Sequence, residues 1–473
     1  MTSFDMPIDS SSLSYLNELP FDLKDNILDL IEEPRHLISM ALTCKGWLSM
    51  IIPNHLEYRQ LCVYWPGRQD FWAHLALRAD LANNVRSLRL TTKEDPAFER
   101  LPKRLLQSGD TEEHPTAFGP DTVQMITEAI LNLKSLKAFT WVGSQGHSMY
   151  TIPIFEALHE CANLEELHMV QMFPRLESSR LYTSLLKHSN LKKLTLHGKV
   201  WSNFFEIYRT LVAFIDQSPE LEELTISYNP MSTLFTSCAL THLTKLHLYA
   251  ESSSAAAALS SDTTILDFIV SHPSIQDLKW YPRDERLEIP QGVLPNLRRL
   301  YTKDRIAKIL LNDMSVAGSR KMEVISQISL GPNTVNLLQN MDGTNIQELH
   351  LWRFEDLEQI DGISGLFPNI KTIDIPNIIQ AGRNTVDDCI ETLSRFPLLE
   401  RFLDSSLWLA MHTMPQDFKQ DTINRLGAAC PNLRSLGHWK VTNRKPWEIV
   451  LRREGGEVKC IERLDPDDIH LYK

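Results

Sequence analysis

The sequence of 473 residues lacks the features that define several large classes of protein. Its seven cysteines include no C-x-x-C pair, which argues against a disulfide framework and for reduced thiols in the cytosol or nucleus. No Asn-x-Ser/Thr site for N-glycosylation occurs, and the amino terminus is too acidic and polar for a signal peptide. No apolar run approaches the ~20 residues of a membrane span. We therefore expect a soluble protein of the cytoplasm or nucleus, with no membrane partner.

Positive charge is also scarce. The chain carries 48 Lys and Arg against 60 Asp and Glu, a formal net charge of −12, so no broad basic surface is available for phosphate backbones and we expect no nucleic-acid partner. Hydrophobic residues make up 43% and charged residues 23%, which is ordinary for a globular protein and excludes a disordered chain. The length leaves room for more than one domain.

Motifs of enzyme active sites are missing as well. The chain contains no P-loop, G-x-G-x-x-G, G-x-S-x-G or H-E-x-x-H. Its sixteen histidines do not cluster with cysteines at the spacing of zinc ligands. We expect no enzymatic activity, no cofactor and no metal site.

Short helices are predicted near the start of the chain, after a polar leader at 1–15. Pro20 suits the first turn of a helix, and the residue before Pro34 avoids helical geometry, which ends the first helix there. Apolar residues at helical spacing continue to Pro53, where the pattern breaks. Three helices over 16–52 bury little surface by themselves, so we expect this module to dock on something else.

The same run resembles an F-box, a family whose motif opens with L-P-x-E-L-x-x-x-I-L and closes on Cys-Lys-x-Trp; Asp22 stands where glutamate is commoner. The resemblance implies binding of a Skp-type adaptor, and through it a cullin scaffold, by helix-in-groove docking. The implied adaptor-binding residues are Leu19, Pro20, Leu23, Ile27, Leu28, Leu37, Leu42, Cys44 and Trp47. The alternative is a self-contained helical cap that buries these residues against the rest of the chain.

A repeat fills most of the remaining sequence. Candidate units of the pattern L-x-x-L-x-L, in which other apolar residues can replace leucine, begin at thirteen positions: 85, 136, 164, 191, 221, 243, 275, 297, 325, 346, 370, 399 and 433. The last apolar position fails in the units at 297, 399 and 433. Apolar residues two apart point to one face of a strand, which argues against an all-helical solenoid. A helix followed by a strand every ~20–29 residues is typical of leucine-rich repeats. The predicted fold class is α/β, with a three-helix module followed by a leucine-rich repeat horseshoe, a curved parallel sheet, over 85–441.

Prolines mark the predicted corners between helix and strand, because proline ends a helix and favours extended geometry in its neighbour. They stand two residues before the repeat motif at Pro219, Pro273, Pro295, Pro368, Pro397 and Pro431. The ends C-x-N-L and P-N-L are similar to the cysteine-containing repeats of F-box proteins. That resemblance implies that Cys161 and Cys430 are small buried core residues.

Four segments fall outside the regular repeat. Residues 53–84 are predicted to be a helical linker that caps the first strand. Residues 92–121 form a charged insertion, and residues 251–262 are low in complexity, which indicates a flexible surface loop. The tail at 442–473 is predicted to form one hairpin that closes the far end.

A candidate target-binding surface follows from the pleat of the predicted strands. The fifth motif position and the residue after the motif point away from the core. In the middle repeats these positions hold His247, Tyr249, Lys279, Tyr281, Tyr301, Lys303, His350 and Trp352. Such a mixture suits protein recognition, and Lys279 and Lys303 would suit an acidic or phosphorylated peptide. Aromatic residues also sit well on exposed strands for structural reasons alone.

The leading hypothesis is therefore a substrate-recognition subunit of an SCF-type (Skp–cullin–F-box) ubiquitin ligase, in which the repeats hold a target protein that the sequence does not identify. The alternative is a leucine-rich-repeat scaffold or regulator that binds the adaptor without promoting ubiquitylation.

Overall fold

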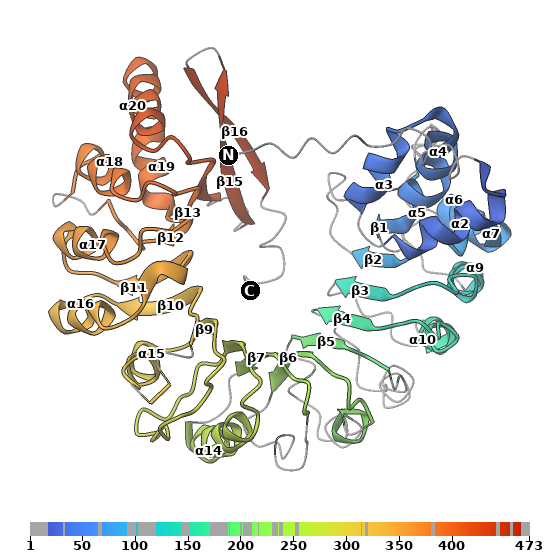
Figure 1. Cartoon of the computed structure of the whole chain (residues 1–473), viewed down its shortest axis with the longest axis horizontal. Helices are drawn as coiled ribbons and strands as arrows, with labels where there is room; N and C mark the ends of the chain where they lie inside the picture. Colours follow the sequence, from blue (N-terminus) through green and yellow to red (C-terminus); the bar gives the residue numbers. More distant parts are fainter. Residues whose placement is uncertain are drawn as a thin grey trace. The chain divides into compact units, whose positions relative to one another are not determined.

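The computed structural model divides into two compact units, residues 1–221 and 222–473. Both are built from parallel strands with helices on one face of the sheet (Figure 1). The structure describes residues 18–31, 34–64, 69–91, 101–102, 120–142, 152–170, 188, 190–198, 201, 211–215, 217–228, 235, 240–250, 255–313, 315–316, 320–379, 384–440, 445–454 and 457–464.

The first unit joins a group of short helices to a parallel sheet. The helices are α2 (Phe21–Leu30), α3 (Pro34–Ala41), α4 (Lys45–Met50), the π-helix η1 (Ile51–Leu56), α5 (Glu57–Arg59), α6 (Gln69–Leu77), α7 (Ala79–Ala82), α9 (Pro120–Leu131) and α10 (Ile152–Leu158). The strands are β1 (Gln60–Tyr64), β2 (Ser87–Thr91), β3 (Ala138–Val142), β4 (Glu166–Val170) and β5 (Lys193–His197). Each strand pairs in parallel with the next one along the chain.

The second unit continues the same alternation of helix and strand. Its strands are β6 (Glu223–Tyr228), β7 (Lys245–Ala250), β8 (Asp277–Lys279), β9 (Arg299–Tyr301), β10 (Val324–Ser329), β11 (Glu348–Arg353), β12 (Thr372–Asp374), β13 (Arg401–Phe402), β14 (Ser435–Lys440), β15 (Lys445–Glu454) and β16 (Glu457–Leu464). Its helices are α14 (Ala255–Ser271), α15 (Asp304–Leu311), α16 (Pro332–Gln339), the 3-10 helix η3 (Gly343–Asn345), α17 (Leu357–Ser364), α18 (Val386–Ser394), α19 (Ser405–His412) and α20 (Gln416–Ala429).

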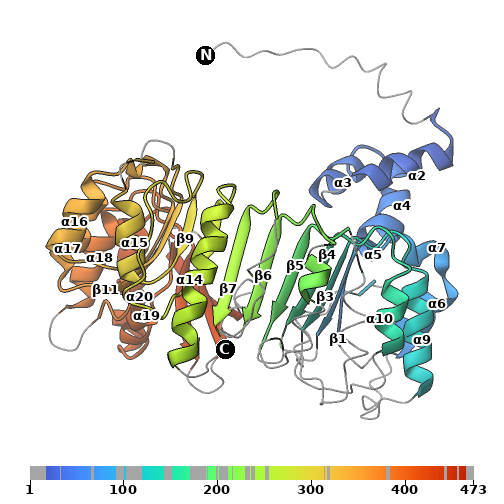
Figure 2. The same ribbon diagram turned by 90° about the horizontal axis from the view of Figure 1, so that it is seen from below.

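Strands β6 to β14 are parallel and follow sequence order, whereas β14, β15 and β16 pair antiparallel. Figure 2 shows the strands of each unit side by side, with α14 and α15 on the helical face of the second unit. The predicted fold class is confirmed: the chain is a mixed α/β leucine-rich repeat solenoid with an amino-terminal helical region, and all thirteen predicted repeats contain a strand.

The fourth position of the repeat forms the core of each sheet. In the second unit, Leu224, Leu246, Leu278 and Leu300 are partners in successive strand pairs. Each of these side chains is at most 1% exposed. A single repeat could not bury its leucines, so the stacking of neighbours supplies the hydrophobic contribution to stability.

Turns before the strands explain the P-N-L and C-x-N-L sequences. All six predicted corner prolines lie in turns directly before a strand, as expected. The asparagine of the turn then bonds the preceding repeat: Asn369 Nδ2 donates to the Thr344 carbonyl at 2.7 Å, and Asn432 Nδ2 to the Pro397 carbonyl at 2.8 Å. These bonds satisfy carbonyl groups that the corner would otherwise leave without a donor.

Cysteines of this motif are core residues, as the resemblance implied. Cys161 and Cys430 are each 2% exposed. Burial raises the pKa of both thiols to about 11, so they remain protonated at neutral pH and are poor nucleophiles.

The segment 53–84 differs from the predicted helical linker, because it contains the first strand of the sheet. Strand β1 pairs in parallel with β2, and Leu61 and Val63 align with Leu88 and Leu90. A tyrosine, Tyr58, replaces leucine at the first motif position, so the repeat escapes a search for leucines. Of the aromatic residues in this segment, Phe71 and Trp72 are fully buried; the side chain of Tyr64, and Trp65, lie outside the described residues.

The predicted register at 325 is wrong by three residues. Ile325 pairs with Leu300 of β9 and Leu349 of β11, which both hold the fourth motif position, so this repeat starts at Met322. The register then shifts at Gln327, whose φ of +60° lies in the left-handed region. A bulge of this kind inserts one residue into a strand, which is why the spacing of apolar residues misled the alignment.

The predicted loop at 251–262 is also wrong from Ala255 onward, because α14 begins there. Alanine has the highest helix propensity of all residues, and α14 continues through the buried Ile265 and Phe268. The predicted leader, most of the insertion at 92–121 and the end of the tail lie outside the described residues.

The carboxyl-terminal hairpin is confirmed, as β15 and β16. The outer side of β16 carries side-chain caps from α20 at Val458. The backbone N–H of Val458 donates to Asn424 Oδ1 at 3.1 Å, and the backbone carbonyl of Val458 accepts from Gln420 Nε2 at 3.0 Å.

Acid is expected to destabilise the first unit through His188, which is 8% exposed and stacks on His159 with ring centroids 4.7 Å apart. Burial lowers the pKa of His188 from 6.5 to about 4. Between these values the unfolded chain holds the extra proton, so stability falls as pH falls, by about 2 kcal/mol from pH 7 to pH 5. Urea unfolding at the two pH values measures this loss. The His188→Phe variant should lose correspondingly less; an equal loss in both proteins would contradict the assignment.

Candidate functional site

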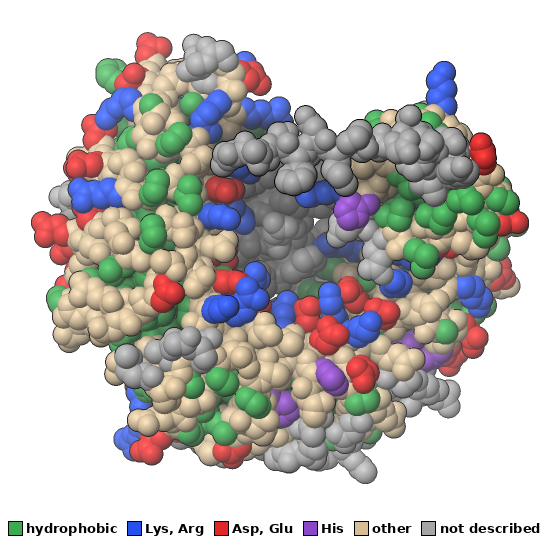
Figure 3. Space-filling view, viewed as in Figure 1, with side chains coloured by type: hydrophobic (Ala, Val, Ile, Leu, Met, Phe, Trp, Pro, Cys, Tyr) green, Lys and Arg blue, Asp and Glu red, His purple; other side chains and the backbone are tan. Residues whose placement is uncertain are grey.

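Exposed apolar side chains are concentrated on the helical module, which we define as residues 18–56. Among the residues that the structure describes, seven of the fourteen large hydrophobic side chains that remain exposed belong to this module. They are Phe21, Leu23, Leu30, Ile38, Leu42, Leu48 and Ile52, with exposed fractions from 37% to 82%. Figure 3 shows hydrophobic side chains gathered over this part of the first unit. Large apolar side chains that are exposed and gathered in this way mark an interaction site.

The module also has a small core of its own. Leu28, Leu37, Trp47 and Ile51 pack together at 4% exposure or less, with Ala41 and Met50 beside them. Lys24 places its ammonium 5.7 Å from the centre of the Trp47 ring, a cation–π contact that covers the indole. The module therefore folds around one side of its helices and leaves the other side uncovered.

The predicted adaptor-binding residues fall on both sides of these helices. Pro20, Leu23 and Leu42 are exposed. Leu19, Ile27 and Cys44 are half-buried, whereas Leu28, Leu37 and Trp47 lie in the module core. The motif did not identify Phe21, Leu30, Ile38, Leu48 and Ile52, which are exposed. The signal for these residues is helical spacing: they occupy positions on α2 to η1 that do not face the core.

Polar contacts tie the module to the start of the sheet. Arg59 of α5 is 3% exposed and donates hydrogen bonds to the carbonyl groups of Leu28 and Ile31 at the end of α2. Arg86, directly before β2, lies 2.6 Å from Asp29 of α2. Because α5 runs directly into β1, the module and the first strands are joined by covalent continuity, a buried guanidinium and an ion pair.

A second candidate surface lies in the second unit, on the face of the sheet turned away from the helices. The ammonium of Lys279 lies 4.7 Å from the ring centre of Tyr249 and 5.9 Å from that of Tyr301. Burial raises the pKa of both phenols, so they stay neutral. Lys279 is half-buried and contacts two tyrosines of the same surface. That it would also face an acidic ligand stays a prediction.

The two predicted histidines belong to the same surface. His247 Nε2 lies 2.8 Å from Asp277 Oδ1, and its ring meets Tyr301 edge to face at 6.0 Å. Burial lowers the pKa of His247 although Asp277 opposes the shift. His350 lies 6.5 Å from the Tyr301 ring and 3.6 Å from Asp374. The strands therefore bring His247, Tyr249, Lys279, Tyr301 and His350 together in one packed row.

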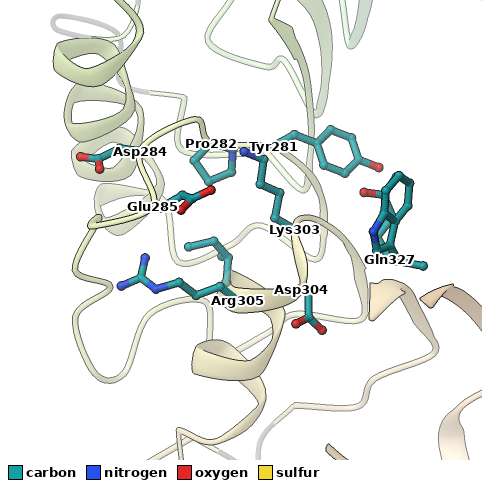
Figure 4. Close-up of a pocket in the computed structure, with 10 residues that line it drawn as sticks. Tyr281, Pro282, Asp284, Glu285, Lys303, Asp304, Arg305 and Gln327 are labelled. Atoms are coloured by element: carbon teal, nitrogen blue, oxygen red, sulfur yellow. The ribbon is translucent and has the colours of Figure 1, made fainter. Parts of the chain in front are cut away.

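The remaining three predicted residues line a pocket at the carboxyl ends of β8, β9, β10 and β11. Its volume is about 670 Å³, and Tyr281, Lys303 and Trp352 contribute to its walls. The other lining residues are Pro282, Asp284, Glu285, Asp304, Arg305, Ile306 and Gln327 (Figure 4). Gln327 was missed by the sequence analysis because the bulge that places it is invisible to the repeat pattern.

The parts of the chain that the structure describes contain neither a cluster of metal ligands nor a helix fit to span a membrane. No three His, Cys, Asp or Glu side chains there come close enough to hold a metal ion. No described helix combines the length and the apolar character that a membrane span requires.

Comparison with known proteins gives similarity to solved structures alone: no family model and no curated protein matches the chain. An internalin from Listeria monocytogenes is 11% identical, with 81% of this chain and 91% of that chain covered and a TM-score of 0.31. A chain from the yeast complex of Rad7 and Elc1 is 13% identical, with 80% and 93% covered and a TM-score of 0.37.

Proposed function

We propose that this protein is a substrate-recognition subunit of an SCF-type ubiquitin ligase. The helical module binds a Skp-type adaptor, which connects to a cullin scaffold, and the repeats bind a target protein. The observation that carries the proposal is the apolar surface of the module, on which Leu30 is 82% and Leu42 is 78% exposed. Side chains of this size are unfavourable in water, and a partner helix groove would cover them.

The contact with the adaptor is assigned to the exposed residues. Leu23 and Leu42 would lie in the interface, together with the neighbouring exposed side chains of α2, α3 and α4. Leu28, Leu37 and Trp47 would act indirectly, because they hold the helices in place from within the core. In this assignment, some of the residues that match the F-box motif bind the adaptor, and the others keep the module folded.

In this proposal the chain performs no bond chemistry. Its contribution is proximity, because a target held on the repeats has a high effective concentration near ubiquitin that is loaded on another subunit. The contacts of Arg59 and Arg86 support this role, since a rigid joint keeps the adaptor and the first strands in a constant relation.

Calorimetric titration of the purified full chain with a Skp-type adaptor tests the first step. We expect one adaptor to bind one chain with a dissociation constant below about 1 μM, which is a free energy of about −8 kcal/mol. Absence of binding would refute the proposal.

The adaptor complex is then joined to a cullin and to ubiquitin-loaded enzyme, with proteins that co-purify with the chain. We expect ubiquitin transfer to these partners, whereas adaptor binding without transfer would establish the scaffold alternative.

A further inference from the structure

The pocket of the second unit is the strongest unassigned site in the described part of the chain. Parallel strands place their carboxyl ends at one edge of the sheet, and four of them contribute here: Tyr281 follows β8, Lys303 follows β9, Gln327 lies in β10 and Trp352 lies in β11. The volume of about 670 Å³ is within the range of ligand sites in proteins. Part of an extended chain could therefore enter it.

The aromatic side chains of the pocket leave surface available for a ligand. Trp352 is 65% exposed, and tryptophan is the residue most often found to dominate binding energy at interfaces. Tyr281 is half-buried, and burial raises its pKa to about 12. Its hydroxyl therefore keeps its proton at physiological pH and can donate a hydrogen bond.

Gln327 is held toward the pocket by the bulge in β10. Its φ of +60° is a conformation that glutamine rarely adopts. The strand register shifts on either side of it, between Ser326 and Ile328 and again after Ile328. The side chain of Gln327 has no hydrogen-bond partner among the described residues, so its amide is available to a ligand. Backbone conformations of this kind are found where a side chain has been redirected toward a site.

Charges in and beside the pocket balance once Lys308 is counted, which disfavours a strongly charged ligand. Five charged residues line it: Lys303 and Arg305 against Asp284, Glu285 and Asp304. Asp304 Oδ2 lies 2.8 Å from the ammonium of Lys308, which is outside the pocket. Two charges of each sign therefore remain. Figure 4 shows Asp284 and Glu285 on one side, Tyr281 and Gln327 on the other, and Lys303 between them.

The wall formed by Tyr281, Gln327, Trp352 and Lys303 is rich in hydrogen-bond donors. The phenol, the primary amide, the indole N–H and the ammonium all donate. The carboxylates of Asp284 and Glu285 lie on the side away from Tyr281 and Gln327, whereas Asp304 lies below Lys303 (Figure 4). A complementary segment would offer carbonyl acceptors, few N–H groups, no net charge and flat apolar side chains for the aromatic rings. Proline-rich sequence in polyproline II conformation has all four properties, and it loses little conformational entropy on binding because it is already extended.

We propose that this pocket binds a proline-rich segment in polyproline II conformation, with proline rings on Trp352 and Tyr281 and backbone carbonyls hydrogen-bonded to Gln327 and Lys303. That such a segment belongs to a ubiquitylation target rests on the function proposed above. The chemistry of the pocket does not depend on that function.

Titration of the ¹⁵N-labelled full chain with decaproline, followed through the indole N–H signals of the ten tryptophans, tests the proposal. The Trp352 signal is assigned by its absence in Trp352→Phe. We expect decaproline to shift this signal with a dissociation constant on the order of 100 μM. Trp352→Ala, followed by the backbone amide signals that move in the wild type, should bind at least about tenfold more weakly, whereas Trp352→Phe retains a ring and much of the affinity.

The Gln327→Gly variant separates binding from folding, because glycine adopts a φ of +60° without strain. We expect it to bind decaproline about three- to tenfold more weakly while its thermal stability is unchanged or higher. Decaglutamate and a Gly-Ser peptide of equal length are the comparison ligands. An unmoved Trp352 signal at millimolar decaproline, equal affinity in Trp352→Ala, or tighter binding of either comparison ligand would overturn the proposal.

Adaptor titration on the same samples keeps the two proposals distinct. Decaproline binding without adaptor binding would leave the pocket assignment intact and remove the ligase function. Adaptor binding without decaproline binding would remove the pocket assignment and leave the proposed ligase function intact.

Discussion

A chain that carries Leu23→Glu and Leu42→Glu is expected to bind a Skp-type adaptor at least about 100-fold more weakly than the wild type. These leucines are 49% and 78% exposed in the free chain, so the substitutions remove no core packing. In the complex they would place two carboxylates in an apolar groove without partners, and desolvation of an unpaired charge is costly. The loss corresponds to about 2.7 kcal/mol or more of binding free energy and is measured by calorimetric titration.

The matched control is Leu77→Glu on α6. Leu77 is 83% exposed, belongs to the same unit and lies outside the helical module, so the same change of side chain should leave adaptor affinity within about twofold of wild type. Thermal unfolding verifies that all variants fold. A double variant that binds the adaptor as tightly as the wild type would remove the assignment of the exposed leucines to the interface.

Gly437→Ala is expected to lower the free energy of unfolding by about 3–5 kcal/mol, near the upper end of the range for single substitutions. Gly437 lies in β14, and a Cβ at this position would overlap the backbone carbonyl group of Leu403, directly after β13. A flexible side chain could move away, but here the backbone of the neighbouring repeat must shift. Strand pairing between β13 and β14 already comprises few residues, so the shift disrupts the sheet directly.

Gly365→Ala provides the comparison, because a Cβ there meets nothing within 4 Å and Gly365 has a helical φ of −71°. Its stability should stay within about 0.5 kcal/mol of wild type. Urea unfolding, with each variant measured beside the wild type, gives both differences. A Gly437→Ala protein as stable as Gly365→Ala would contradict this prediction, because it would show that β13 and β14 can move apart at Leu403 without loss of stability.

The sequence was sufficient to predict the solenoid because every repeat places apolar residues at the same motif positions. Each leucine at the fourth motif position aligns with the corresponding residue of the next strand, so thirteen weak signals reinforce one another. The first strand was missed since Tyr58 takes the place of leucine, and the register near 325 failed because a bulge adds one residue. Low complexity predicts a loop at 255–262, but alanine favours helices and a helix forms there.

Predictions about the sites were less complete, for a different physical reason. A motif reports which residues are apolar but not which side of a short helix finds a partner within the chain. Leu28 and Leu42 both match the F-box pattern, yet one is fully buried and the other is 78% exposed. Similarly, Lys279 lies in β8, whereas Lys303 lies two residues after the adjacent strand β9. The ammonium of Lys279 lies over the ring of Tyr249, whereas Lys303 lines the pocket.

The two amides that α20 presents to β16 bear on the behaviour of the protein at high concentration. A sheet assembled from repeats ends in a strand that can recruit a strand from another molecule, which is the usual route to fibrous aggregates. At Val458 both outward backbone groups are already occupied by Asn424 and Gln420. A strand from another molecule would have to displace these side chains before it could pair with β16. At Val458 the edge of the sheet is therefore protected against the addition of further copies of the chain.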